Sequence, residues 1–488
     1  MTSEPYDAKG RVRKLVALVA GPALFLIMLA APAPTAFAPQ SWLVLGLAAW
    51  MMVWWTTGAL PLFVTALLPI AVLPLSGTGR VPEIAGAYVH PLIILFLGGF
   101  LVAKAVERWS LHRQIASAIL PLGGASPAGL VGSIMLATAF LSMWLSNTAT
   151  AMVMVPIAAA IVQALPHKGP DDKNPSPLGA SLMLGVAFSS TIGGMATLIG
   201  TPPNALMAAY LEEAHGIAIG FWQWMLLGVP VSATLLLVCW LLLTRLAFNL
   251  TEWTRSEIAA AIAQAMPAQT APPSGAKRTA IVGAVTGAAL VLKPVLNWLI
   301  PGLGLEDAEI AMIGAVAVLL LPSGDSNGSR LLGWREARGI RWDVLILFGG
   351  GLALAEAIDS SGLSLVIGSG LATLGGMPIW FVVLLAMVVM VFLGELASNT
   401  AMAAVFLPVA SAVALSMGVS ATDIVLPIGL AASLGFMLPV ATPPNAIVFS
   451  TGIVNATQML RTGLVLDLVA IAVVFTLVRV IGSLIIPT

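Results

Sequence analysis

The chain has 488 residues, of which 59% are hydrophobic and only 9% are charged. A soluble protein carries about 25% charged residues, so the composition excludes an ordinary soluble domain and predicts a protein that spans the membrane several times. The 21 basic and 21 acidic residues balance, which excludes the basic surface of a nucleic-acid-binding protein. The single cysteine, Cys239, excludes an internal disulfide.

The first quarter of the chain predicts four spans. An apolar run follows the polar residues 1–13, and its length favours an uncleaved first span, although Thr35-Ala36-Phe37-Ala38 resembles a signal-peptidase site. Further spans are predicted at 41–58, 61–77 and 89–107, each near the roughly 20 residues that a bilayer requires. The basic segment from Lys104 to Arg113 predicts an amphipathic helix at the membrane interface.

Residues 124–165 form two apolar arms separated by Ser146-Asn147-Thr148. Two full spans would place this polar turn at a membrane surface, whereas two shorter arms would form a re-entrant hairpin with its tip inside the protein. The hairpin is favoured because its tip then meets a break in the next span, 178–212. Thr201-Pro202-Pro203-Asn204 causes that break, since consecutive prolines cannot stay within a continuous helix. The hydrophilic loop Pro166–Pro177 closes the hairpin, and another span follows at 221–247.

A connector at 248–278 leads to a second half that repeats this plan. Thr254 and Glu257 fit a capping box that opens a short helix in the connector. The second half predicts spans at 279–301, 308–322 and 342–358, a hairpin at 377–416, a broken span at 424–451 and a last span at 464–486.

The two halves are related by a sequence repeat. Ser398-Asn399-Thr400 repeats the first tripeptide 252 positions later (398 − 146), and Pro408 follows Pro156 at the same offset. Thr442-Pro443-Pro444-Asn445 repeats the first break 241 positions later (442 − 201). Polar, helix-breaking segments at corresponding places in two halves are typical of the midplane site of a secondary transporter.

The predicted fold is therefore an all-α integral membrane protein with two inverted-topology repeats, eleven transmembrane helices and two re-entrant hairpins. A cytoplasmic N-terminus places most of the 21 basic residues on the cytoplasmic side, as the positive-inside rule requires. The predicted scaffold comprises residues 14–122 and 279–376. The predicted transport parts comprise residues 123–247 and 377–488.

The polar segments suit a cation beside an anion. Hydroxyl, amide and freed carbonyl oxygens are ligands for Na⁺, while the N–H groups at half-helix N-termini favour an anion. No Lys or Arg occurs from Trp342 to Leu460. A bound dianion would therefore lack a compensating charge in a medium of low dielectric constant, which gives a physical reason for coupling to Na⁺.

The doubled Ser-Asn-Thr motif, each copy followed by a Thr-Pro-Pro-Asn break, resembles the divalent anion/sodium symporter family of dicarboxylate, citrate and sulfate carriers, over residues 14–486. The resemblance implies one Na⁺ site at each hairpin tip and its facing break, with substrate between the two motifs. By position, the first Na⁺ site would use Ser142, Ser146, Asn147 and Gly200, and the second Gly394, Ser398, Asn399 and Ala441. Asn147, Thr148, Asn399 and Thr400 would contact substrate, with Thr201, Pro202, Thr442 and Pro443 lining the breaks. Relatives often have a hydroxyl at the position of Gly394, where only a carbonyl would serve here.

The resemblance also implies a homodimer in the bacterial cytoplasmic membrane that carries C4-dicarboxylates such as succinate, malate or fumarate by an elevator motion. Dicarboxylate exchange, sulfate or citrate transport and a passive anion channel stay open as alternatives. An enzyme is not expected, because no Ser–His or paired-Asp arrangement is found at membrane depth and the four histidines show no metal spacing. Glu395 replaces Met143 in register, and either tunes a cation site, carries a proton or bonds a helix end.

Overall fold

The computed structural model describes residues 8–165, 176–250, 253–265, 273–325, 328–370, 376–482 and 485. Its regular structure in these ranges is helical, with one isolated bridge between Pro322 and Arg330. Most of the predicted loop at 166–177 and part of the connector lie outside the described residues. Six described helices are long and apolar enough to cross a membrane, and eight if each of two bent pairs is one span. The predicted total of eleven stays a prediction.

The first scaffold part begins with the paired helices α1 (Ala8–Ala30) and α2 (Pro39–Thr57). The prediction of one continuous span at 61–77 is wrong. This segment forms two short helices, α3 (Leu62–Thr65) and α4 (Leu68–Val72), because Pro69 has no N–H to continue the first. After α5 (Val81–Gly86) and the turn η1 (Ala87–Val89), the chain bends by 41° into α6 (Pro91–Arg108). The helix expected after Lys104 is α7 (Leu111–Ile119), followed by the turn η2 (Leu120–Gly123).

Both predicted hairpins and both broken spans are present. The first hairpin consists of α8 (Pro127–Ser142) and α9 (Asn147–Ala164), and the first broken span of α10 (Pro177–Gly194) and α11 (Pro202–His215). The second hairpin consists of α19 (Ile379–Gly394) and α20 (Asn399–Met417), and the second broken span of α21 (Ala421–Ala431) and α22 (Pro443–Ser450). Each hairpin arm of 16 to 19 residues is about 24 to 29 Å long at 1.5 Å per residue.

The remaining helices follow the predicted order. They are α12 (Phe221–Leu241) with its π-helical end η3 (Leu242–Ala247), α13 (Arg255–Ala265), α14 (Ser274–Leu299), α15 (Asp307–Leu320), α16 (Trp334–Ala337), α17 (Trp342–Ser360), α18 (Leu363–Gly370), α23 (Ala456–Leu477) and η5 (Val478–Gly482). The last span begins at Ala456, earlier than the predicted 464. Asn455 caps it, since its Oδ1 accepts the N–H of Gln458 at 2.8 Å and its own N–H donates to Gln458 Oε1 at 3.0 Å.

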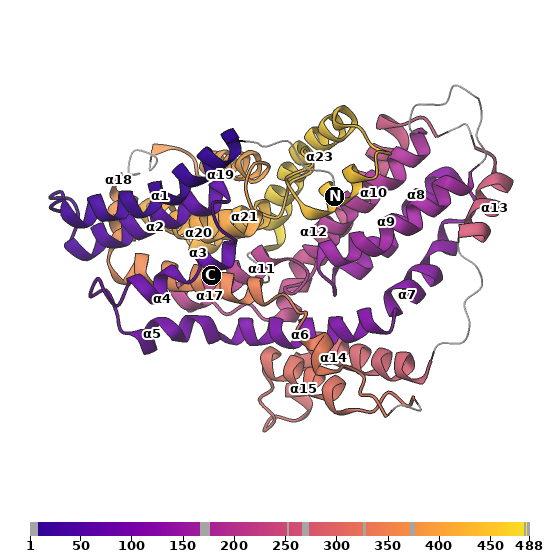
Figure 1. Ribbon diagram of the computed structural model, residues 1–488, viewed down its shortest axis with the longest axis horizontal. Helices are drawn as coiled ribbons and strands as arrows, with labels where there is room; N and C mark the ends of the chain where they lie inside the picture. The colour runs from indigo at the N-terminus through magenta and orange to yellow at the C-terminus, as the bar shows by residue number, and fades with distance from the viewer. Residues whose placement is uncertain are drawn as a thin grey trace.

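Burial separates the centre of the molecule from its periphery. Every residue of α10 from Leu178 to Gly194 is buried, whereas α14 has exposed apolar side chains such as Ile281, Val285 and Trp298. Figure 1 shows α14 and α15 together at one edge of the molecule, beside α6. A largely exposed apolar helix is expected where a protein faces lipid or a second subunit.

The glycine pairs that repeat between the halves allow helices to pack closely. A Cβ atom on Gly98 of α6 would lie 2.6 Å from the backbone carbon of Ala311 in α15. A Cβ atom on Gly350 of α17 would likewise lie 2.6 Å from the Cα atom of Ala66, which follows α3. Only glycine permits such backbone contact, as is common between membrane helices. These glycines therefore serve helix packing.

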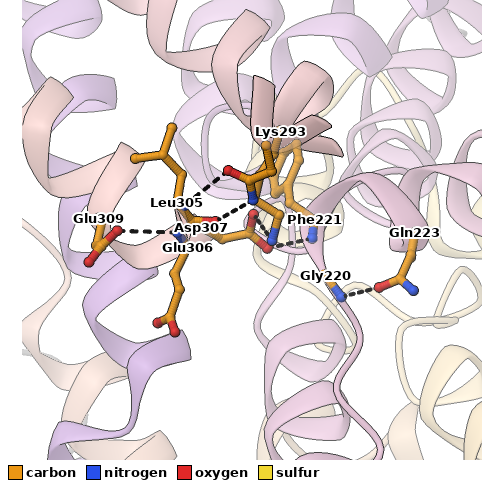
Figure 2. A network of polar contacts seen from close by, with 9 residues as sticks. Gly220, Phe221, Gln223, Lys293, Leu305, Glu306, Asp307 and Glu309 are labelled. Atoms are coloured by element: carbon orange, nitrogen blue, oxygen red, sulfur yellow. Dashed lines mark hydrogen bonds and ion pairs between the residues drawn. The ribbon is translucent and has the colours of Figure 1, made fainter. Parts of the chain in front are cut away.

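A polar network links the start of α12 to α14 and α15 (Figure 2). Lys293 Nζ lies 2.7 Å from Asp307 Oδ1, and the backbone N–H of Phe221 donates to Asp307 Oδ2 at 2.7 Å. Only 18% of the Lys293 side chain and 9% of the Asp307 side chain are exposed. In the predicted division of the chain, this network joins a transport helix to two scaffold helices.

Candidate functional site

Both hairpin tips and both helix breaks line one cavity of about 700 Å³. Its lining includes residues 146–148 and 398–400 from the tips, and residues 199–203 and 440–444 from the breaks. The structure thus brings together the four polar segments that the repeat singled out, although they span some 300 residues of sequence. All eight predicted substrate residues line this cavity. Ser146, Asn147, Gly200, Ser398, Asn399 and Ala441 of the predicted sodium sites line it too, whereas Ser142 and Gly394 lie behind the tips.

At the first tip, oxygen atoms converge around the Asn147 amide. Ser142 Oγ donates to Ser190 O at 2.6 Å and lies 2.8 Å from Asn147 Oδ1. With its amide nitrogen turned inward, Asn147 donates to Ser142 Oγ at 2.8 Å and to Gly200 O and Ser190 O at 3.2 Å each. With its oxygen turned inward, the Asn147 amide places that oxygen within 3.2 Å of three others, on Ser142, Ser190 and Gly200, and such a group of neutral oxygens is the kind of donor set that a hard cation takes.

Ser146 holds the hairpin turn. Its Oγ accepts the N–H of Ala149 at 3.3 Å, and its carbonyl accepts the N–H of Thr150 at 2.9 Å. Ser146 is therefore the N-cap of α9. Of the four residues predicted for the first sodium site, the structure brings the polar atoms of Ser142, Asn147 and Gly200 together, while the Ser146 hydroxyl caps the helix.

At the second tip, the side-chain oxygen of Asn399 is buried and has no hydrogen-bond partner among the described residues. A Cβ atom on Gly394 would lie 3.3 Å from this oxygen, so the backbone of Gly394 passes directly beside it. An unsatisfied buried acceptor costs about 1–3 kcal/mol. A cation at this point would remove that cost, so the residues present fit the predicted second sodium site.

Two asparagines hold the helix breaks open. Asn204 Nδ2 donates to the carbonyls of Gly194 and Thr197, at 3.2 and 2.8 Å. Asn445 Nδ2 makes the equivalent bonds in the second half, at 3.3 Å to Gly435 O and 3.0 Å to Leu438 O. Both asparagines are fully buried. Neither asparagine was among the predicted site residues, although their repetition at the offset of the two breaks indicates a shared structural role.

Comparison with known proteins identifies the family. Residues 12–486 match the family model described as the sodium:sulfate symporter transmembrane region. The chain belongs to this family. The match confirms the resemblance to the divalent anion/sodium symporters and covers nearly the whole chain.

Named relatives of this symporter chain are sodium-dependent dicarboxylate transporters. The transporter SdcS of Staphylococcus saprophyticus is 35% identical over 473 residues, which cover 96% of this chain and 91% of the relative. SdcS of Staphylococcus aureus is 33% identical over 471 residues, which cover 95% and 90%. Two solved structures share the fold at low identity. The YdaH transporter of Alcanivorax borkumensis has a TM-score of 0.59 at 16% identity, covering 92% of this chain and 99% of its own. MtrF of Neisseria gonorrhoeae has a TM-score of 0.58 at 15% identity, covering 96% and 99%.

One charged pair in this symporter lines the cavity and was not anticipated. Arg341 and Asp343 both belong to the lining, and the guanidinium contacts both carboxylate oxygens at 2.9 Å. Arg341 directly precedes the stretch from Trp342 to Leu460 that has no basic residue, so it was not among the predicted site residues. The two charges cancel locally. Among the described lining residues, no unpaired cation faces the cavity.

One Ser–His contact in the structure was not predicted. His215 Nε2, at the end of α11, lies 2.7 Å from Ser411 Oγ of α20. The contact joins residues 196 positions apart, so no local sequence pattern predicts it. Ser411 is only 2% exposed and neither residue lines the cavity, so the pair has no access to a substrate there. It fits a structural contact between two helices.

Proposed function

We propose that this symporter takes up C4-dicarboxylates such as succinate, malate or fumarate together with Na⁺. The observation that carries the proposal is the convergence of two oxygen-rich hairpin tips and two helix breaks on one cavity without an unpaired cation. The names of the Staphylococcus relatives support both the substrate class and the coupling ion.

Four helix N-termini supply the attraction for a dianion. Helices α9, α11, α20 and α22 begin at Asn147, Pro202, Asn399 and Pro443, and all four residues line the cavity. Each N-terminus carries the equivalent of about half a positive charge. Together these partial charges favour a dicarboxylate, but they leave its two formal charges only partly compensated. In this proposal the carboxylates contact the side chains of Asn147, Thr148, Asn399 and Thr400.

Sodium ions at the two tips would add the remaining positive charge. The first ion would be held by Ser142, Ser146, Asn147 and Gly200, and the second by Gly394, Ser398, Asn399 and Ala441. Because each tip would bind Na⁺ on one side and substrate on the other, bound Na⁺ would lower the electrostatic cost of the dianion. The position of each tip between Na⁺ and substrate is the proposed physical basis of coupling.

We further propose that the protein works as a homodimer in the bacterial inner membrane, with a cytoplasmic N-terminus and an elevator motion of the hairpins, broken spans, α12 and α23. The cavity is also lined by the end of α2 and the start of α17. In the proposed orientation these are cytoplasmic ends, so the cavity opens inward. The exposed apolar faces of α14 and α15 are consistent with a lipid or dimer contact.

Uptake of labelled succinate into proteoliposomes tests the proposal. An inward Na⁺ gradient should drive accumulation that choline does not support, and equal uptake in choline would refute the coupling. Asn147→Ala and Asn399→Ala should abolish uptake. Asn297→Ala is the matched control, because its amide bonds only the chain near Leu305.

Two further arms of the same assay separate the alternatives. Uptake that requires dicarboxylate inside the vesicles would indicate exchange. Competition by sulfate or citrate stronger than that by malate would reassign the substrate.

A further inference from the structure

A second cavity, of about 790 Å³, lies beside the first hairpin and is separate from the cavity at the two tips. Helices α6, α7, α8 and α14 line it, together with the tip residues Trp144 and Leu145. We call it the side groove. Apart from Gln114, Thr286 and Trp144, the residues that line it are glycines or have hydrocarbon side chains. The Thr286 hydroxyl already donates to Val282 O at 2.8 Å, so the groove is almost entirely apolar.

Small residues of α14 form one wall of the side groove. They recur at the spacing of one helix face, and they are Ala280, Gly283, Ala284, Gly287 and Ala288. The three alanines are exposed, so the groove is open at the surface of the molecule and is not an internal void. Along α14 it extends from Ala280 to Leu292.

The length of the side groove matches one leaflet of a bilayer. Its 12 positions along α14 (292 − 280) correspond to about 18 Å at 1.5 Å per residue. Half of the hydrocarbon core of a bilayer is about 15 Å thick. Helix α14 is itself long and apolar enough to cross a membrane, so the groove lies at the depth of the lipid tails. Water does not fill such a site, because each bound water needs two to four polar partners.

A basic side chain stands at one end of the groove. Lys277 lies three positions before Ala280 and seven before Ala284, and therefore on the same face of α14. It is exposed in the first turn of the helix, where a membrane span meets the lipid headgroups. Its ammonium group makes no ion pair with any described residue.

The other basic side chains of α6 and α14 already have partners. Their contacts are Lys104 with Glu107 at 2.8 Å, Lys293 with Asp307 at 2.7 Å, Arg108 with Glu336 at 3.5 Å and Arg278 with Pro322 O at 2.6 Å. The start of α14 packs beside the junction of α6 and α7, because Gly275 lies against the ring of Trp109. Arg113 of α7 is exposed and adds a second positive charge near this end. The end of the groove at Lys277 is therefore suited to an anion.

The second hairpin has a smaller counterpart of the groove. A cavity of about 240 Å³ is lined there by Leu396 and Ala397, which follow Trp144 and Leu145 at the repeat offset of 252. No basic residue lines this second cavity. The first hairpin thus combines the larger apolar groove with a charged end. One residue, Ile199, lines both the side groove and the cavity at the tips.

We propose that the side groove binds an acyl chain of an anionic phospholipid, and that Lys277 binds the phosphate of its headgroup. The chain lies on the small residues of α14 and contacts the first hairpin tip. It touches Ile199 from the side opposite the cavity at the tips. The proposal depends on the membrane location of the protein and not on its substrate.

Native mass spectrometry of the purified protein tests the headgroup. The wild type is titrated with dioleoyl phosphatidylglycerol and with dioleoyl phosphatidylcholine, which have identical chains. The anionic lipid should bind about fivefold tighter, which is the contribution of one basic side chain near a membrane surface. Lys277→Gln should remove this preference, whereas Arg255→Gln, on an exposed position of α13 outside the groove, should keep it. Equal binding of the two lipids to the wild type overturns the proposal, and this comparison needs no variant to fold.

A bulky substitution tests the position of the chain. Ala284→Phe fills the groove and should lower the affinity for phosphatidylglycerol at least tenfold. Val285→Phe is the matched control, because Val285 is 63% exposed on the same helix and does not line the groove. Undiminished lipid binding by folded Ala284→Phe overturns the proposal. If Ala284→Phe instead converts a dimer to monomers with lipid binding unchanged, a second copy of the chain covers the groove, and the proposal is overturned as well.

Discussion

Replacing Asn204 by alanine should weaken sodium binding at the first tip without touching a proposed ligand. The Asn204 amide donates to the carbonyls of Gly194 and Thr197, and Thr197 Oγ1 in turn accepts the N–H of Gly200 at 3.1 Å. Gly200 is a proposed sodium ligand. Each buried carbonyl left without a donor costs about 1–3 kcal/mol. The backbone of the break can shift so that these carbonyls find other donors, and this shift displaces Gly200.

One buried carbonyl without a donor would destabilise the sodium-binding conformation by about 1–3 kcal/mol. The affinity for sodium would then fall by roughly 5- to 150-fold. The assay is the Na⁺ dependence of succinate uptake in proteoliposomes, together with Na⁺-dependent thermal stabilisation of the purified protein. Asn297→Ala controls for the general loss of an amide that makes two hydrogen bonds. A folded Asn204→Ala protein whose half-saturating Na⁺ concentration changes less than twofold would refute the role of this asparagine.

Three other substitutions probe the site and the packing. Ser142→Ala removes the hydroxyl that donates to Ser190 O and should raise the half-saturating Na⁺ concentration severalfold. Ser133→Ala, also buried on the same helix, should leave that concentration unchanged. Equal effects of the two variants would mean that Ser142 only stabilises the fold. Gly98→Val should prevent α6 from packing on α15 and reduce the yield of monodisperse protein in size-exclusion chromatography, while Gly283→Ala, whose nearest neighbours are 3.9 Å away, should purify normally. Arg341→Met leaves Asp343 unpaired at the cavity and should raise the KM for succinate, most strongly at low ionic strength. Adding Asp343→Asn should restore the KM, and failure to do so would show that Arg341 acts on the substrate itself.

The sequence predicted the parts of the fold that depend on local signals. The double prolines after Thr201 and Thr442 and the tripeptides at Ser146 and Ser398 each break a helix wherever they occur, so the hairpins and broken spans followed from the repeat alone. The error at residues 61–77 had a local cause as well, because the average hydrophobicity of that segment outweighed the prolines within it.

What the sequence could not predict depends on contacts between distant residues. The Ser411–His215 contact joins residues 196 positions apart, and Glu395 accepts the N–H groups of Met437 and Leu438, which are 42 and 43 positions away. A hydrogen bond from Glu395 to a helix end was one of the alternatives left open, but its partners Met437 and Leu438 lie in the break between α21 and α22 and not at a helix end. The roles proposed for the substrate and sodium residues stay predictions, although the structure brings most of them to one cavity.

The network around Asp307 bears on how membrane voltage would act on the proposed motion. Lys293 and Asp307 belong to α14 and α15, which the proposed division assigns to the scaffold, and α12 contributes to Asp307 only the neutral N–H of Phe221 (Figure 2). If α12 departs during a transport cycle, the formal charges stay behind as a pair. A charge carried across the membrane would cost or yield about 2.3 kcal/mol per 100 mV. In the proposed elevator motion, this contact would therefore break and form without moving a formal charge across the membrane, so any voltage dependence would come from the transported ions.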